Sequence, residues 1–155
     1  MPTHAEKRFL PFTPMQMFDL VLAVEHYPEF LPWCVATRIN SKTENANGGE
    51  MLADMAIGFK SFRETYTSKV TFEKPTAEKS GHIHVVDSNG PFKRLITDWR
   101  FNQADGGMEV EFDIDFEFRS TMMEKLIGSV FSTATKRMVD AFVGRAEKLY
   151  SGIND

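Results

Sequence analysis

The stretch TMMEKLIGSVFSTATKRMVDAFVGRAEKLY, residues 121–150, decides the predicted fold. Its apolar residues recur at intervals of three and four, the spacing that places them along one face of an α-helix. They are Met123, Leu126, Ile127, Val130, Ala134, Met138, Phe142, Ala146 and Leu149. Thr121 and Glu124 match a capping box, so we expect one long helix that begins at Thr121. Such a helix spans roughly 45 Å, and its apolar face therefore requires a wide, curved partner.

Alternating apolar and polar residues elsewhere in the chain predict that this partner is a β-sheet. The clearest strand runs from Met108 to Phe118, where apolar residues alternate with acidic ones. Other strands are predicted at residues 3–10, 35–42, 51–59, 62–72, 81–87 and 92–101. In the first of them, Ala5 and Phe9 share one side, opposite Glu6 and Arg8.

Two short helical segments follow the first strand. Thr13-Pro14 begins a helix that ends near Val24, and a single turn is predicted between Pro28 and Pro32. Because short connections favour antiparallel neighbours, we expect an α+β fold in which a curved seven-stranded antiparallel sheet wraps around the long C-terminal helix. The chain has 155 residues, and we expect a single domain, residues 1–155.

Charge and composition narrow the function classes. The chain has 18 Lys and Arg against 22 Asp and Glu, a net charge of −4, with no block of one sign. This balance weighs against RNA or DNA as the main partner. The single cysteine places no demand on an oxidising compartment. The sequence contains no signal-peptide core and no run of about 18 apolar residues, so we expect a cytoplasmic protein.

The 14 Phe and 9 Met suit either an ordinary core or a cavity for an apolar guest. Between Gly128 and Thr135 the long helix carries mostly small residues, which either leave space for a guest or let the helix pack closely on the sheet. Tyr66 and Trp99 are polar-tipped residues on apolar rows. Glu64 also falls on the apolar side of its strand, where it either reaches solvent at the strand end or is buried and then hydrogen-bonded or protonated.

Three other features are weighed as sites. His82 and His84 share one face of a strand, but no third ligand stands at a useful spacing, so no metal site is predicted. Cys34 is expected to be a small buried residue, because a nucleophilic cysteine needs a histidine and an orienting group beside it. The acidic residues between Glu109 and Glu117 are expected to form a solvated strand face.

Residues 27–34, YPEFLPWC, resemble the signature of the coenzyme Q-binding protein family within the START-like, or polyketide cyclase, superfamily. FRETYTSKV at 62–70, GPF at 90–92 and WRF at 99–101 follow in the family's order, and the resemblance covers nearly the whole chain. It implies a helix-grip fold around a deep apolar cavity. It also implies non-enzymatic binding of ubiquinone or a related isoprenoid lipid, in support of respiratory electron transfer or quinone biosynthesis.

A bacterial subset of the family is described as a ribosome-association toxin that hinders the joining of ribosomal subunits. The chain lacks the long transit peptide of the mitochondrial members, which indicates a bacterial source. We therefore expect ubiquinone as a bound ligand, no other cofactor, and a location in the cytoplasm with possible peripheral contact with the inner membrane.

The inward rows and the resemblance together predict the ligand-binding residues. They are Phe30, Leu31, Trp33, Met55, Phe59, Phe62, Glu64, Tyr66, Val70, Phe92, Trp99, Phe112, Leu126, Val130 and Ala134. Phe30, Leu31 and Trp33 are expected to form a rim that either touches a membrane or plugs one end of the sheet.

Three functions follow from this pattern. The first is a non-enzymatic carrier of ubiquinone or a similar isoprenoid lipid. The second is a ribosome-associated inhibitor of subunit joining. The third is a cyclase-type enzyme, which would need an acid or base in the cavity. The residues eligible for that role are Glu64, Tyr66, His82 and His84.

Overall fold

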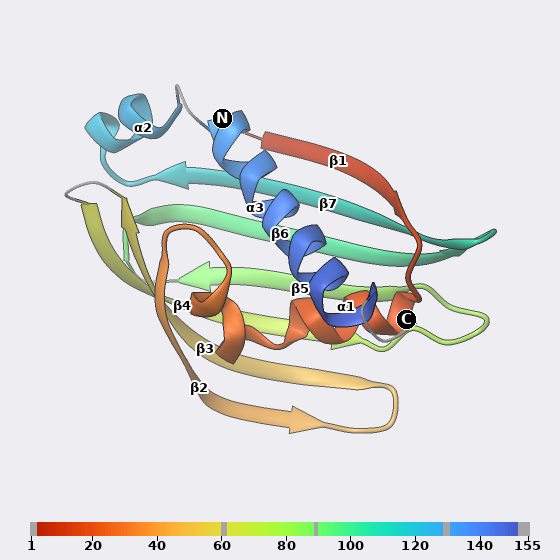
Figure 1. The fold of residues 1–155 in the computed structure, drawn as a ribbon. Helices are drawn as coiled ribbons and strands as arrows, with labels where there is room; N and C mark the ends of the chain where they lie inside the picture. The colour runs from red at the N-terminus through yellow and green to blue at the C-terminus, as the bar shows by residue number, and fades with distance from the viewer. Residues whose placement is uncertain (1–2, 60–61, 89, 129–130, 152–155) are drawn as a thin grey trace.

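Seven antiparallel strands form one sheet in the computed structural model, which describes residues 3–59, 62–88, 90–128 and 131–151 (Figure 1). The strands are β1 (Thr3–Leu10), β2 (Cys34–Glu44), β3 (Gly48–Phe59), β4 (Phe62–Glu73), β5 (Gly81–Ser88), β6 (Phe92–Ala104) and β7 (Gly107–Phe118). Their order in the sheet is β1-β7-β6-β5-β4-β3-β2. Strands β2 to β7 therefore each pair with their neighbour in sequence, and β1 closes the arrangement by pairing with β7.

The helices lie on one face of this curved sheet (Figure 1). They are α1 (Pro14–Leu22), the 3-10 helix η1 (Val24–Glu29), α2 (Thr121–Gly128), α3 (Phe131–Ala146) and the π-helix η2 (Glu147–Ser151). Figure 1 shows α3 running diagonally across the sheet, with α1 beside its C-terminal end and α2 at the opposite end. The predicted α+β, helix-grip architecture is thus confirmed. None of the helices in the described residues is long and apolar enough to cross a membrane.

The C-terminal helix predicted from Thr121 to Tyr150 corresponds to α2, α3 and η2 in the structure. α2 ends at Gly128 and α3 begins at Phe131, and the continuity of the predicted helix at positions 129 and 130 lies outside the described residues.

The predicted capping box at Thr121 is wrong, because the residue that caps the start of α2 is Ser120, one position earlier. The Oγ of Ser120 accepts a hydrogen bond from the backbone N–H of Met123 at 3.3 Å. The carboxylate of Glu124 accepts one from the backbone N–H of Phe118 at 2.8 Å, so it ties the start of α2 to the end of β7.

The turn predicted between Pro28 and Pro32 is displaced toward the N-terminus. Pro28 lies inside η1, which covers Val24–Glu29. This short helix is attached to α1, because the hydroxyl of the buried Tyr27 donates a hydrogen bond to the carbonyl of Val21.

Strand β1 turns its polar side inward. Leu10 lies opposite the buried Met108 of β7, and the alternation of the strand then leaves Phe9 57% exposed. The inward Arg8 contacts Asp140 of α3 through Nη2 and Oδ1, which are 2.6 Å apart. This ion pair joins the edge strand to the helix that crosses it.

The main core fills the space beneath α1. Phe18 of α1 is fully buried and makes edge-to-face contacts with Phe72 of β4 and Phe101 of β6 at centroid distances of 6.1 and 5.7 Å. A smaller apolar cluster lies at the other end of the sheet's inner face. It consists of Phe92, Leu95, Phe116 and Phe118.

A buried polar pair interrupts the apolar inner face of the sheet. Ser68 of β4 and Asp87 of β5 lie directly opposite each other, and the serine hydroxyl donates a hydrogen bond to the aspartate Oδ1. Burial raises the pKa of Asp87 to about 7, although the hydrogen bond from Ser68 acts to lower the pKa. The folded protein therefore holds a proton that the unfolded chain releases near its ordinary pKa of 3.8.

This proton predicts how stability depends on pH. Because the folded state binds the proton more tightly, the stabilising contribution is complete below pH 4 and is lost as the pH rises toward 7. We expect the free energy of unfolding of the natural protein to fall relative to that of Asp87→Asn, by up to about 1.4 kcal/mol for each pH unit in this window. Urea unfolding of both proteins at several pH values measures the difference. Two parallel stability curves would contradict the assignment.

Candidate functional site

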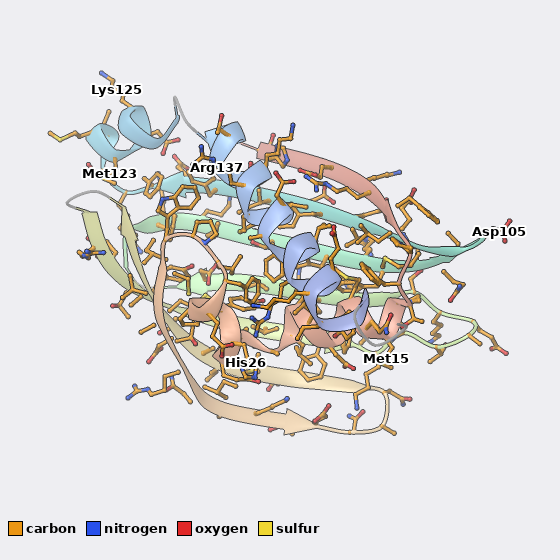
Figure 2. All side chains as sticks on the ribbon, in the orientation of Figure 1. Met15, His26, Asp105, Met123, Lys125 and Arg137 are labelled. Carbon is orange, nitrogen blue, oxygen red and sulfur yellow. The ribbon has the colours of Figure 1, made fainter. Side chains whose placement is uncertain are left out.

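An apolar pocket of about 460 Å³ lies between α3 and the inner face of the sheet, at the end away from α1. Its walls come from η1 and the segment after it, from the start of β2, from strands β3, β4, β6 and β7, and from the first half of α3. The lining residues are Tyr27, Leu31, Pro32, Trp33, Cys34, Met55, Ile57, Gly58, Tyr66, Phe92, Leu95, Ile114, Phe116, Phe118, Thr133, Ala134, Thr135, Arg137 and Met138. Figure 2 shows Arg137 on the half of α3 that lies away from Met15 of α1.

Small residues of α3 leave the pocket open. Thr133, Ala134 and Thr135 face it, whereas farther along the same helix the buried Phe142 packs edge-to-face on Trp99 at a centroid distance of 5.0 Å. A large side chain therefore fills the space between helix and sheet at one end, and small side chains leave it unfilled at the other. The small residues after Gly128 thus mark space rather than close packing at the positions that the structure describes.

Aromatic rings build the sheet side of the pocket. Phe92 lies edge-to-face with Tyr66 at a centroid distance of 5.3 Å and stacks with Phe118 at 5.0 Å. Phe116 and Phe118 are themselves in edge-to-face contact at 5.1 Å. This wall is well packed, because aromatic pairs favour such offset arrangements.

The buried polar groups of the pocket are few and neutral. The hydroxyl of Tyr66 contacts the thioether sulfur of Met55 at 3.7 Å. Burial raises the pKa of the Tyr66 hydroxyl well above its ordinary value and raises that of the Cys34 thiol to about 11. Both groups therefore stay protonated at neutral pH. Among the described lining residues, Arg137 alone carries a charge, and it is exposed.

The half-exposed Leu31, Pro32 and Trp33 form the rim of the pocket. Trp33 has a φ of 67°, a left-handed conformation that is uncommon for a residue with a side chain. Its carbonyl accepts a hydrogen bond from the backbone N–H of Gly58 in β3 at 2.9 Å. This bond holds the rim against the sheet at the point where β2 begins.

A second contact fixes the rim segment to α3. Phe30 makes edge-to-face contacts with Tyr27 and Phe142, and the guanidinium carbon of Arg145 lies 5.3 Å from its ring centroid. The same guanidinium binds Glu29 of η1, with Nη2 and Oε1 2.7 Å apart. Phe30 is thus a support of the rim and does not line the pocket, although it was predicted to bind the ligand.

Six of the predicted ligand-binding residues line the pocket. They are Leu31, Trp33, Met55, Tyr66, Phe92 and Ala134. Four others, Phe59, Phe62, Leu126 and Val130, have side chains outside the described part of the structure. Whether the six contact a ligand stays a prediction.

The remaining predicted residues lie elsewhere. Val70, Trp99 and Phe112 are buried in the main core, where neighbouring side chains cover them completely. Glu64 is exposed, because its position is near the end of β4, where the strand reaches solvent. Val70, Trp99 and Phe112 therefore do not line the cavity as predicted, and Glu64 takes the first of its two alternatives, in which it reaches solvent.

Several lining residues were missing from the predicted set. Phe118 continues the alternating row of β7, on which Ile114 and Phe116 were already expected to face the cavity. Cys34 and Thr135 gave no comparable signal, because their places depend on how the rim and α3 meet.

His82 and His84 lie on the outer face of the sheet beside Asp98, away from the pocket.

A family model described as polyketide cyclase/dehydrase and lipid transport matches residues 10–143. The chain is 38% identical over 145 residues to the ribosome association toxin RatA of Rickettsia prowazekii, covering 92% of this chain and 94% of that protein. It is 30% identical over 148 residues to the mitochondrial coenzyme Q-binding protein of Schizosaccharomyces pombe, covering 90% of this chain and 84% of that protein.

Solved structures show the same fold. The solution structure of an 18 kDa protein from Caulobacter crescentus is 31% identical, with a TM-score of 0.75 and coverage of 97% of this chain and 99% of that one. An aromatase/cyclase from a Streptomyces species has a TM-score of 0.76 at 13% identity, covering 95% and 94% of the two chains, which is a likeness of fold alone. The match over residues 10–143 and these relatives show that the chain belongs to the polyketide cyclase/dehydrase and lipid transport family.

Proposed function

We propose that the protein is a non-enzymatic carrier that binds ubiquinone or a similar isoprenoid lipid in the pocket beneath α3. The observation that carries this proposal is the pocket's lining, in which apolar and aromatic side chains predominate. Of its two tyrosine hydroxyls, that of Tyr27 donates to the carbonyl of Val21 and that of Tyr66 contacts the thioether of Met55. Its volume of about 460 Å³ lies within the roughly 300–1,000 Å³ typical of small-molecule sites. A headgroup and the first part of a tail fit such a space.

Burial of the tail supplies the affinity in this account. Each CH₂ group that leaves water contributes about 0.8 kcal/mol, so ten such groups contribute about 8 kcal/mol before the costs of association. The pocket needs few polar contacts to bind such a guest.

Tyr66 supplies the orientation. A quinone carbonyl is a stronger hydrogen-bond acceptor than the thioether of Met55, which the Tyr66 hydroxyl now contacts. Because burial raises the pKa of Tyr66, its hydroxyl keeps the proton that it would donate. The headgroup would therefore lie toward β4, with the tail between Ala134 and the aromatic wall.

The lining also favours a carrier over an enzyme. No Asp, Glu or His occurs among the described lining residues, and Tyr66 with its raised pKa is a poor base at neutral pH. The name of the fission yeast relative, a coenzyme Q-binding protein, and the lipid-transport description of the family both support a quinone as cargo.

The rim gives the cargo a route. Trp33 and Leu31 are half exposed at the pocket edge, and tryptophan favours the interface between lipid headgroups and hydrocarbon. We infer that the rim touches a membrane surface when lipid enters or leaves.

A pocket-filling substitution tests the proposal directly. In Ala134→Phe the ring extends from α3 into the pocket, and we expect binding of ubiquinone with a short isoprenoid tail to weaken at least tenfold. Quenching of tryptophan fluorescence measures this affinity, because Trp33 lines the pocket. The matched control is Gly144→Phe on the same helix, where an added Cβ meets no atom within 4 Å. If Ala134→Phe stays folded and binds as tightly as the natural protein, the pocket is not the site.

A second substitution separates the headgroup from the tail. Tyr66→Phe removes one neutral hydrogen bond, which contributes about 0.5–1.5 kcal/mol, so we expect two- to tenfold weaker quinone binding. A polyisoprenoid hydrocarbon of the same tail length should bind both proteins equally, because it offers no acceptor. An equal loss for both ligands would show that Tyr66 acts through packing and not as a donor.

Association with the ribosome is the second candidate function. The observation that favours it is the 38% identity to a relative named as a ribosome association toxin. With a net charge of −4, this chain would contact a ribosomal protein more readily than rRNA phosphates.

Salt dependence tests this second candidate. We expect recovery with the large ribosomal subunit in sucrose gradients to change by less than tenfold between 50 and 200 mM salt, whereas a protein that binds through phosphates loses roughly 10³–10⁵ in affinity. Absence from the subunit fraction at both salt concentrations would eliminate the candidate. A steep loss would place the contact on rRNA.

A further inference from the structure

Two histidines and one aspartate converge on the outer face of the sheet. His82 and His84 alternate outward along β5, while Ile83 between them is buried in the main core. Asp98 of β6 lies directly opposite His84 in the strand register and also points outward. The sequence pattern offered no third ligand for the histidine pair, because Asp98 is brought there only by the pairing of β5 with β6.

The three side chains share one point. The Oδ1 atom of Asp98 lies 2.8 Å from Nε2 of His82 and 2.7 Å from Nδ1 of His84. One ligand atom from each residue lies within 4.8 Å of the other two. The side chains are 28%, 38% and 26% exposed for His82, His84 and Asp98, so a cation can reach them from solvent.

We propose that His82, His84 and Asp98 form a binding site for a divalent transition-metal ion of the Zn²⁺ type. Imidazole nitrogen suits Zn²⁺, Cu²⁺, Ni²⁺ and Fe²⁺, whereas Ca²⁺ and Mg²⁺ prefer oxygen ligands alone. A site with two histidines and one carboxylate leaves at least one position for water or a partner's ligand.

The geometry needs only a small adjustment. Ligand atoms about 2.0–2.2 Å from a tetrahedral Zn²⁺ stand roughly 3.4 Å apart. The aspartate oxygen is closer than this to the nitrogens, at 2.7 and 2.8 Å, and all three atoms lie within 4.8 Å of one another. Rotation of the imidazole rings provides the difference without any change of the backbone.

The backbone beneath the site is rigid. β5 and β6 are interior strands of the sheet, each paired on both sides. On their inner face Ile83 and Trp99 are directly opposite each other and 2% and 4% exposed. Ligands carried by such strands keep their relative positions better than ligands on loops.

Neighbouring strands place further carboxylates beside the three ligands. Glu73 of β4 lies directly opposite His82, and Asp113 of β7 lies directly opposite Asp98. Both are exposed, and residues directly opposite on one face have Cβ atoms about 5 Å apart. Arg100 is also opposite His82, and its charge interacts with Glu111 on the next strand. Either Glu73 or Asp113 can serve as a fourth ligand.

The metal site is independent of the pocket. The inner face of the sheet carries the pocket and the core, and the three ligands project from the other face. A metal bound there cannot take part in chemistry on a guest in the pocket. It would instead cross-link β5 to β6 or accept a ligand from a docking partner.

Zinc titration of the untagged protein tests this proposal. Isothermal titration calorimetry with ZnCl₂ should give one site for each chain, and Co²⁺ should develop the visible d–d absorption of a site with nitrogen ligands. We expect His82→Ala, His84→Ala and Asp98→Asn each to weaken Zn²⁺ binding at least tenfold. Asp98→Asn keeps the size of the side chain and one acceptor oxygen, so weaker Zn²⁺ binding by this variant reports the carboxylate ligand and not the fold.

His26→Ala provides the matched control. His26, labelled in Figure 2, forms a histidine–carboxylate pair with Glu29 at 2.7 Å, the same distance as His84 to Asp98, but with one histidine only. Its loss should leave Zn²⁺ affinity and stoichiometry unchanged. Equal binding by all four variants, or no binding to the natural protein at micromolar Zn²⁺, would show that the cluster is a hydrogen-bonded pair only and would overturn the proposal.

Discussion

The inner face of the sheet is mostly apolar, and the helices cover it unequally. At one end the fully buried Phe18 of α1 packs on Phe72 and Phe101 of the sheet, and Phe142 of α3 packs on Trp99. At the other end α3 presents Ala134 and two threonines, which are too small to reach the aromatic wall. Apolar surface that a helix does not cover must be covered by something else or stay exposed to water. The pocket is the result of this mismatch, and a lipid that fills it would complete the core.

The same helix also fixes the entrance to the pocket. Arg145 of α3 binds Glu29 and lies over Phe30. The segment that precedes the rim is therefore attached to α3, the helix that covers the pocket. The rim carbonyl of Trp33 is attached to β3 through Gly58. Polar contacts therefore connect α3, the rim and the sheet around the apolar pocket. A guest that separates α3 from the sheet would act on these contacts, which links the state of the pocket to the shape of the rim.

Local periodicity predicted most of the fold, since alternation found all seven strands and the helical spacing found α1 and α3. It failed where neighbouring residues have similar propensity or where tertiary contacts decide. The cap of α2 lies at Ser120 rather than at Thr121, two residues that are equally suited to this position. Alternation places Glu64 on the same side of β4 as the inward residues. It cannot predict where along its length a strand extends beyond the core.

The candidate site was predictable to the extent that its residues lie on strand rows. Met55, Tyr66 and Phe92 were found in this way, whereas Trp99 and Phe112 share the same rows at the end that α1 fills. Position along a strand therefore separates pocket from core, and alternation contains no information about it. Asp98 illustrates the same limit, because the register between two strands brings it to the histidines.

The most direct test of the central claim is organic extraction of the freshly purified natural protein, followed by mass spectrometry of the extract. An unrelated protein of similar size, purified in parallel, serves as the control. The account predicts an isoprenoid quinone or a comparable apolar lipid in near-stoichiometric amount from this protein alone. An extract that matches the control, before and after incubation with quinone-containing vesicles, would contradict the claim that the pocket beneath α3 holds a lipid.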